Sequence, residues 1–454
     1  MIRPGEVLTI TADTRLEPGT YLVPKGVSIA ADNVTLDGNG ATLIGDGRNQ
    51  TGIAVNGRKN VTIRNVTLRE YKHGIVVRDS RGVGLTNNRI SATGEVPANT
   101  VFLDIWLPGE KAYGGAILLE RVEDAEVCDN DIQHQQNGLL TYYCNKLTIR
   151  GNLANYNSGF GIHLFNTCDS VFEGNFCDFC CRYEPRDETP ESVRANEAHG
   201  HMGGDATGFL IVHNSRRNVF RGNYARLGGD GFFLAGRTPG NAAAGCDDNL
   251  FENNDASLSP NIAFEATFST GNRFLNNRAD RCNYGFWLGF SSENTLEGNR
   301  CIMNRQAGVA CENGRALVVR GNDFQRNGTG ILLWSKYVEP WFADLPENRT
   351  IHHWTIEGNT LTRNGTGLSL AADRDHGIRP MPAEVSGKPE LRPHDNTIIG
   401  NDIQDNRVGV HLAAADRTYI EKNTISRNVE ANVRRDDAGE TMLRNNLGLA
   451  GGYL

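Results

Sequence analysis

Two Gly-Gly-Asp triplets carry the carboxyl groups in this sequence that are best spaced for catalysis. One triplet ends at Asp205, three residues before Gly208, and the other ends at Asp230, one residue before Gly231. If they enter adjacent rungs of one sheet, the two aspartate Cα atoms lie roughly 8 Å apart. An inverting glycoside hydrolase needs ~6.5–9.5 Å between its acid and its base, so the spacing suits that chemistry. The same triplets also suit turns closed by aspartate side chains.

Other polar residues of this region complete the predicted catalytic set. Glu265 follows one coil later as a third carboxyl group. We predict that His163 and His201 orient the substrate or a carboxyl group, and that His199 and Arg237 contact the substrate. One carboxyl group would stay protonated beside apolar side chains and act as the acid, while another would activate water.

A cluster of histidines and cysteines also invites a zinc interpretation. His199 and His201 are two residues apart, and Cys177, Cys180 and Cys181 lie upstream. Cys177 and Cys180, however, occupy repeat positions that core residues hold elsewhere, and no spacing defines a fourth ligand. We therefore predict no metal and no other cofactor.

Large aromatic residues recur at positions that a period-two strand points outward. Tyr142, Phe233, Trp287 and Trp334 stand two or four residues after the small residue that opens a strand. In line on a solvent-facing sheet they would form a platform for stacking sugars, and we predict that they bind substrate. The alternative is that inserted loops cover them as a second small core.

These side chains are positioned by a repeat whose most regular member is asparagine. The asparagines are spaced by 22 or 23 residues where the series is uninterrupted, and each is followed by a small residue and an apolar alternation. The series comprises Asn130, Asn152, Asn175, Asn254, Asn277, Asn299, Asn322, Asn401, Asn423 and Asn446. Such a period, without a 3.6-residue pattern, predicts stacked coils of parallel strands. Asparagines about 4.8 Å apart in that stack would form a buried amide ladder.

The repeat resembles the right-handed parallel β-helix family and, within it, the NosD-like group. The segment Asn322-Asp-Phe-Gln-Arg-Asn327-Gly-Thr-Gly330-Ile-Leu-Leu shows the shared motif, and the resemblance covers roughly residues 30 to 446. It implies an all-β fold and says little about activity, because the fold serves lyases, hydrolases, epimerases, tailspikes and binding proteins.

We predict a single-domain right-handed parallel β-helix over residues 1–454, with loop insertions flanking one sheet. Residues 1–44 would form the N-terminal cap and first rungs, and 176–207, 331–358 and 368–394 would be inserted loops beside a groove. The recurring strand predicts about 13 coils, which begin at Gly52, Gly74, Ala116, Gly138, Gly161, Gly208, Gly231, Ala263, Gly285, Gly308, Gly330, Gly367 and Gly409.

Composition narrows the set of partners. With a net charge of −8 and 46 basic residues scattered among 54 acidic ones, nucleic acid is not expected as a partner. The sequence shows no membrane span and no signal peptide, and its ten cysteines lack framework spacing. We expect a cytoplasmic protein with reduced thiols, a carbohydrate substrate and no membrane partner, and leave a homo-oligomer open.

Three classes of function fit these residues. A glycoside hydrolase needs two carboxylates and an aromatic groove, and it is our main prediction. A polysaccharide lyase or uronate epimerase needs a base and cations; no lysine occurs between Lys146 and Lys336, which leaves a version built on His201 and Arg237. A non-catalytic carbohydrate-binding scaffold would keep the aromatics alone.

Overall fold

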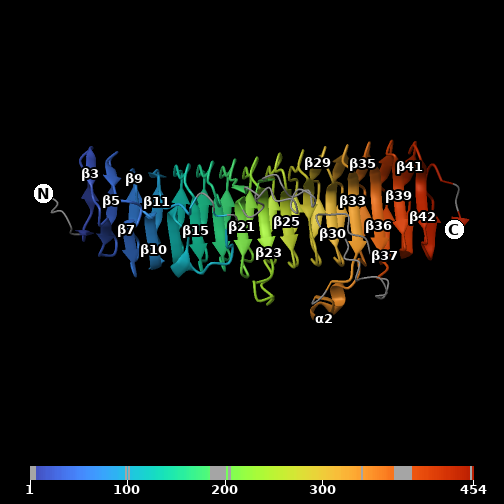
Figure 1. Cartoon of the computed structure of the whole chain (residues 1–454), viewed down its shortest axis with the longest axis horizontal. Coiled ribbons are helices and arrows are strands. Elements are labelled where there is room, and N and C mark those ends of the chain that lie inside the picture. The colour runs from blue at the N-terminus through green and yellow to red at the C-terminus, as the bar shows by residue number, and fades with distance from the viewer. Residues whose placement is uncertain are drawn as a thin grey trace, which may run out of the picture. The chain divides into compact units, whose positions relative to one another are not determined.

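The protein is a parallel β-helix whose stacked strands form the sheets here named A, B and C (Figure 1). Sheet C consists of a four-stranded part and a five-stranded part, one in each unit described below. The computed structural model describes residues 7–97, 100, 103–184, 201–202, 206–338, 341–372, 391–449 and 452–453. The chain divides into two compact units, residues 1–233 with 237–244, and residues 234–236 with 245–454. Within the described residues, no helix has the length and apolar character needed to span a membrane.

In the first unit, parallel strands stack in all three sheets. Sheet A contains, in spatial order, β1 (Leu8–Ile10), β4 (Val27–Ile29), β7 (Thr51–Asn56), β10 (His73–Arg81), β13 (Gly115–Glu123), β15 (Leu139–Tyr142), β17 (Ile162–Phe165) and β21 (Thr207–Val212). Sheet B contains β2 (Thr14–Arg15), β5 (Thr35–Asp37), β8 (Thr62–Arg64), β11 (Gly84–Thr86), β14 (Glu126–Cys128), β16 (Thr148–Arg150), β18 (Val171–Glu173) and β22 (Val219–Arg221). Sheet C contains β3 (Thr20–Leu22), β6 (Thr42–Ile44), β9 (Thr67–Arg69) and β12 (Arg89–Ser91). Outside the sheets lie the short helix η1 (Gly109–Lys111) and the antiparallel pair β19 (Tyr183–Glu184) and β20 (His201–Met202).

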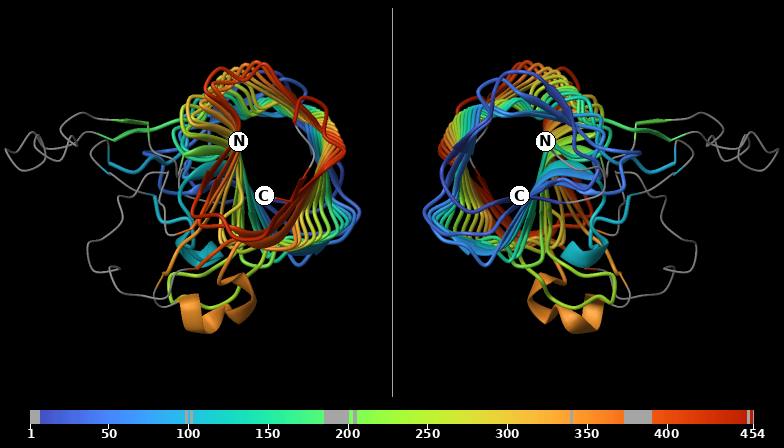
Figure 2. Two further views of the ribbon diagram at one scale, coloured as in Figure 1. Left: turned by 90° about the vertical axis from the view of Figure 1, so that its right-hand side faces the viewer. Right: turned by 90° about the vertical axis from the view of Figure 1, so that its left-hand side faces the viewer.

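The second unit repeats the arrangement, and β23 (Asp230–Ala235) lies where the chain passes from the first unit to the second. Sheet A contains β25 (Ile262–Thr267), β27 (Tyr284–Trp287), β30 (Ala307–Glu312), β33 (Thr329–Ser335), β36 (Thr366–Ala372), β39 (Val408–Ala413) and β42 (Ala431–Asp436). Sheet B contains β24 (Leu250–Glu252), β26 (Arg273–Leu275), β28 (Thr295–Glu297), β31 (Val318–Arg320), β34 (Thr355–Glu357), β37 (His394–Ile399), β40 (Asp416–Glu421) and β43 (Thr441–Arg444), with β44 (Gly452–Tyr453) antiparallel to β43. Sheet C contains β29 (Arg300–Ile302), β32 (Asp323–Gln325), β35 (Thr360–Thr362), β38 (Asp402–Gln404) and β41 (Thr424–Ser426). Helices α2 (Trp341–Asp344) and η2 (Pro346–Asn348) lie outside the coils, as the end-on views show (Figure 2).

The predicted asparagine ladder is present and buried in both units. In the second unit the Nδ2 atom of Asn277 donates to Oδ1 of Asn299 at 3.1 Å and to the carbonyl of Phe251 at 2.9 Å. Its own Oδ1 accepts from Asn254 at 3.0 Å. Each amide therefore joins three coils, and the prediction of a structural ladder is confirmed.

The number of coils exceeds the prediction of about 13. Three further strands belong to sheet A, namely β1 and β4 near the N-terminus and β42 near the C-terminus. In the end coils of β1 and β42 the small residue that opens the recurring strand is replaced by Val7 and Asn432, because end coils are packed on one side only and so are less constrained. The coil of β4 keeps the small residue as Gly26. Two of the predicted insertions also begin inside strands, since β33 extends to Ser335 and β36 to Ala372.

Candidate functional site

Part of the outer face of sheet A in the first unit, around β15 and β17, is covered by the insertion between β12 and β13. Leu103 and Ile105 of this insertion are buried. Trp106 donates its indole N–H to the carbonyl of Arg237 at 3.0 Å, and the Tyr113 carbonyl lies 2.9 Å from Nε2 of His73. These contacts hold the insertion at its middle and at its C-terminal end, so the outward side chains beneath it are shielded from water.

His163 is the most perturbed of the shielded side chains. It is 2% exposed on β17, with its ring centroid 5.1 Å from Tyr142 and 5.5 Å from Phe160. Burial lowers the pKa of His163 to about 3; nearby His213 acts in the same direction, and the Ile105 backbone opposes it. Among the described residues, Nδ1 of His163 has no hydrogen-bond partner. His163 is therefore a neutral imidazole whose Nδ1 atom is unsatisfied.

Tyr142 lies in the same covered cluster. It is 3% exposed, and burial raises the pKa of its phenol. His163 and Tyr142 do not line an open groove, which corrects the predicted geometry: the insertion of residues 94–114 turns this part of the platform into the second small core that was the alternative.

The predicted aspartate pair is only partly described. Asp230 opens β23 and is 1% exposed, and its backbone carbonyl accepts from the Thr207 hydroxyl at 3.0 Å. Asp205 and His199 lie outside the described residues. His201 lies in β20, paired with Glu184 of β19, and its side chain is outside the described part. The proposed convergence of these groups stays a prediction.

Two further predicted substrate contacts belong to the first unit. Phe233 points outward from β23 and is partly exposed, whereas Phe232 and Leu234 on either side of it are buried. Arg237 is also partly exposed, and its guanidinium donates to the carbonyl of Asn241 at 2.6 Å. Arg237 thus braces its own loop in this structure.

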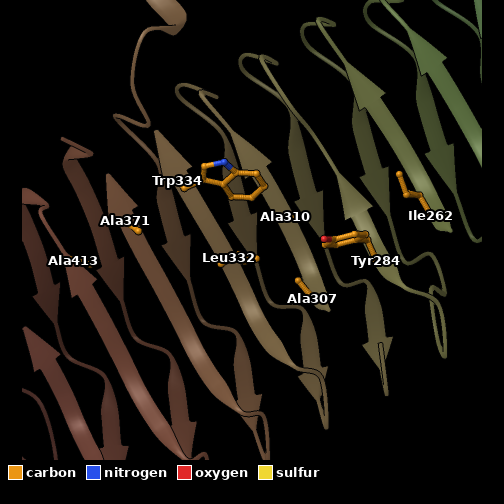
Figure 3. Close-up of a cluster of buried hydrophobic side chains, with 8 residues drawn as sticks. All are labelled: Ile262, Tyr284, Ala307, Ala310, Leu332, Trp334, Ala371 and Ala413. Atoms are coloured by element: carbon orange, nitrogen blue, oxygen red, sulfur yellow. The ribbon is translucent and has the colours of Figure 1, made fainter. Parts of the chain in front are cut away.

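The outer face of sheet A in the second unit is more open. Trp334 is fully buried there, so it is not the exposed ring that the pattern predicts. Figure 3 shows its ring extending over the neighbouring strand toward Ala310, and the small residues Ala371 and Ala413 continue the same column. Small neighbours make room for this indole, which packs as an apolar anchor.

Trp287 is the partly exposed ring of this face. Its centroid lies 4.9 Å from Tyr284 and 5.5 Å from Trp334, edge to face with both. Glu265 is its partner on the adjacent strand and is partly exposed as well. The face therefore presents a ring held by two others, with a carboxyl group one rung away.

Glu312 was not selected from the sequence. It ends β30 beside Trp334 of β33 and is partly exposed on the same face. Two rungs and two residues separate it from Glu265, or about 12 Å between Cα atoms. The sequence signal for Glu312 is a carboxylate at the fourth position after Gly308, which is an outward position of the strand.

No metal site is evident in the described part of the chain, where no group of three or more His, Cys, Asp or Glu side chains is placed to hold an ion. All ten cysteines are free thiols. Cys177 and Cys180 are buried in the core, and burial raises the pKa of both thiols, that of Cys180 to about 12. Protonated core thiols are poor zinc ligands, because a thiol binds zinc as the thiolate.

Comparison with known proteins establishes the family. The profile described as "Right handed beta helix region" matches residues 25–177, 109–242 and 207–343. The chain belongs to this right-handed β-helix family, which confirms the predicted fold class. The narrower NosD-like resemblance stays a prediction. No curated protein matches the sequence.

Several solved structures share the fold. A mutant form of the periplasmic alginate epimerase AlgG matches with a TM-score of 0.45 and 11% identity over 94% of this chain and 79% of that one. The Azotobacter vinelandii mannuronan C-5 epimerase AlgE6 A-module matches with 0.34 and 13% over 96% and 92%. DFA-IIIase from Arthrobacter chlorophenolicus A6 matches with 0.37 and 13% over 68% and 66%. At such low scores and identities, these similarities do not indicate an activity for this chain.

Proposed function

We propose that the protein is a carbohydrate-active enzyme, and specifically a glycoside hydrolase whose sugar lies on the outer face of sheet A. The observation that carries this proposal is the pairing of Trp287 with Glu265 on adjacent rungs. Trp287 is fixed by Tyr284 and Trp334, so it can stack on a sugar without losing much side-chain entropy. Glu265 is then the acid or the base, one rung from the stacked ring.

A second carboxyl group completes the hydrolytic pair. Glu312 offers one on the same face, and the separation of about 12 Å between Cα atoms leaves room for a sugar ring between two glutamate side chains. Asp205 and Asp230 remain the candidates that the sequence favours. The orienting role of His201 stays a prediction, whereas His163 is buried beneath the insertion of the first unit and does not face a sugar on this surface.

The reaction products test the proposal. We expect water addition, seen by mass spectrometry, when the protein is incubated with a panel of glycans and glycosides. Glu265→Gln removes the ionisable group with little change in shape, and loss of an essential acid or base typically costs ~10²–10⁴ in rate. The matched control is Glu297→Gln on the outer side of sheet B, which should retain parental turnover.

Other outcomes separate the alternatives. An unsaturated, ultraviolet-absorbing product would instead establish a lyase, and an isomerised sugar an epimerase. Binding without turnover across the panel would leave a carbohydrate-binding scaffold. Full activity of Glu265→Gln would move the chemistry to other carboxyl groups.

A further inference from the structure

An exposed row of arginines follows the corner after sheet C in the second unit. At this corner each coil has a residue with positive φ, and Arg281 (φ 59°), Arg326 (φ 56°) and Arg363 (φ 59°) occupy it in three coils. Arg305 lies two residues beyond the corner residue of the coil between the first two. All four side chains are exposed. We call these four residues the arginine ridge.

Several surface arginines elsewhere in this fold are paired with an acidic residue one coil away. Arg427 donates two hydrogen bonds to Asp405, at 2.8 and 2.9 Å. Arg417 forms the same two-pronged contact with Asp395, at 2.8 Å for both bonds. In the first unit, Arg217 holds Asp169 in this way, at 2.7 and 2.8 Å. Pairing across adjacent coils is thus common for surface arginines here, although Arg69 and Arg273 are exposed without an ion pair in the described part of the chain.

The ridge departs from this pattern. Within the described residues, none of its four guanidinium groups has a side-chain hydrogen bond or an ion pair. The charge of Arg363 contributes to lowering the pKa of Asp405, but the ion pair of that carboxylate is with Arg427. The ridge therefore leaves four hydrogen-bonding forks open to solvent.

Neighbouring acids do not compensate the ridge. Asp280 lies beside it but is buried and bound to both Arg278 and Arg300. Asp323 accepts from Gln325 at 2.7 Å. Stacked like charges are unfavourable, and here they persist in a chain whose net charge is −8. A local surplus of positive charge on an acidic protein points to an anionic ligand.

The geometry of the row indicates the shape of that ligand. Arg326 and Arg363 occupy equivalent positions on adjacent coils, because Gln325 pairs with Thr362 in sheet C. They are therefore about one rung, or 4.8 Å, apart along the stack, and Arg281 lies two rungs before Arg326. A guanidinium fork matches a carboxylate with two parallel hydrogen bonds. The ridge thus offers repeated carboxylate sites along a straight line.

We propose that the arginine ridge binds a linear acidic polysaccharide laid along the coils. Carboxylates on successive or alternate sugars match a row with this repeat. Nucleic acid fits less well, because the four residues of the row include no aromatic side chain on which bases could stack. This site is separate from the outer face of sheet A and stands whether or not the protein hydrolyses sugars.

A binding measurement tests the ridge directly. The probes are polygalacturonate and hyaluronan, which carry a carboxylate on every sugar and on every second sugar, and fully methyl-esterified polygalacturonate as the uncharged control. We expect the full chain to bind an acidic probe, to bind it less as salt rises, and not to bind the methyl ester. The variant Arg281→Gln/Arg326→Gln/Arg363→Gln should weaken binding about tenfold or more.

The matched control removes the same charge from paired arginines. Arg48→Gln/Arg217→Gln/Arg417→Gln should keep nearly parental affinity, since Arg48 is held by Glu70 in the same way as Arg217 by Asp169. Trp287→Ala should keep ridge binding even if it abolishes turnover. Equal losses in the ridge and control variants would show a general charge effect and overturn the proposal. It is also overturned if neither acidic polymer binds, if the methyl ester binds equally well, or if single-stranded DNA binds more tightly at the same salt.

Discussion

The outer faces of sheet A in the two units start from the same repeat and end in different environments. In the first unit the outward side chains Leu140, Tyr142, His163 and Leu210 are all buried. In the second unit Glu265, Trp287, Glu312 and His411 at outward positions remain partly exposed. An identical strand pattern therefore supports either a core or a binding face, and the loops decide which.

Burial also distinguishes side chains that stabilise the fold from side chains that are free to contact a ligand. Trp334 and Trp287 touch each other, but only Trp334 is completely buried. In the first unit, the carboxylate of Glu120 is likewise buried, held by Arg78 at 2.8 Å and by Arg121 at 2.5 Å. Burial turns groups with catalytic chemistry into structural ones.

The largest effect on stability is expected from Trp334→Ala. Removing a fully buried indole leaves a cavity that alanine neighbours cannot fill, which costs about 3–5 kcal/mol. Denaturant unfolding measures the change, with Trp341→Ala on helix α2 as a partly exposed comparison. If the two variants lose the same small amount, Trp334 is not an anchor and the contrast between the two tryptophans fails.

Asn277→Ala should have a smaller effect, about 1–3 kcal/mol, because it strands the amide groups of the coils on either side. The control is Asn49→Ala, which changes an exposed asparagine outside the ladder. Unfolding midpoints of the two variants give the value. A shift no larger than that of Asn49→Ala would mean that water satisfies the ladder.

The pH dependence of folding stability should report the burial of His163 on the covered face of the first unit. The pKa of His163 is lowered to about 3 in the folded protein, against an ordinary value of 6.5. Its contribution to stability is therefore complete above about pH 6.5 and is lost as the pH falls through 6.5 toward 3. His163→Met should flatten the stability curve over that range, as followed by thermal unfolding from pH 8 to 4. An unchanged acid limb in His163→Met would contradict the burial of this ring.

Much of the fold was readable from the sequence because the repeat is local. Asn277 and Asn299 must recur at one coil length to meet, so their spacing records the ladder directly. The coils of β1 and β42 were not predicted, since end coils are free to lose the motif, and the coil of β4 was not predicted although Gly26 keeps the motif. Burial of Tyr142, His163 and Trp334 was also missed. It depends on insertions and on alanine neighbours at long sequence distance, and the repeat carries no information about either.

The candidate site was readable only in part, for a related reason. Trp287 and Glu265 were found because both occupy the second outward position of their strands. Glu312 occupies the fourth position, where the pattern drew attention to rings such as Tyr142 and Trp334. The sequence shows which side chain occupies each position. Packing decides which of these side chains lie together on an open surface.

The central claim is that the second unit carries the open, sugar-binding face. It is tested most directly by measuring glycan affinity and unfolding free energy together for Trp287→Ala and Tyr142→Ala. The account predicts that Trp287→Ala weakens binding at least about tenfold with a modest stability loss, because its ring faces ligand. Tyr142→Ala should lose several kcal/mol of stability, about 3–5, and keep its affinity under folding conditions. Severe unfolding of Trp287→Ala with unchanged affinity in the folded fraction would contradict the account.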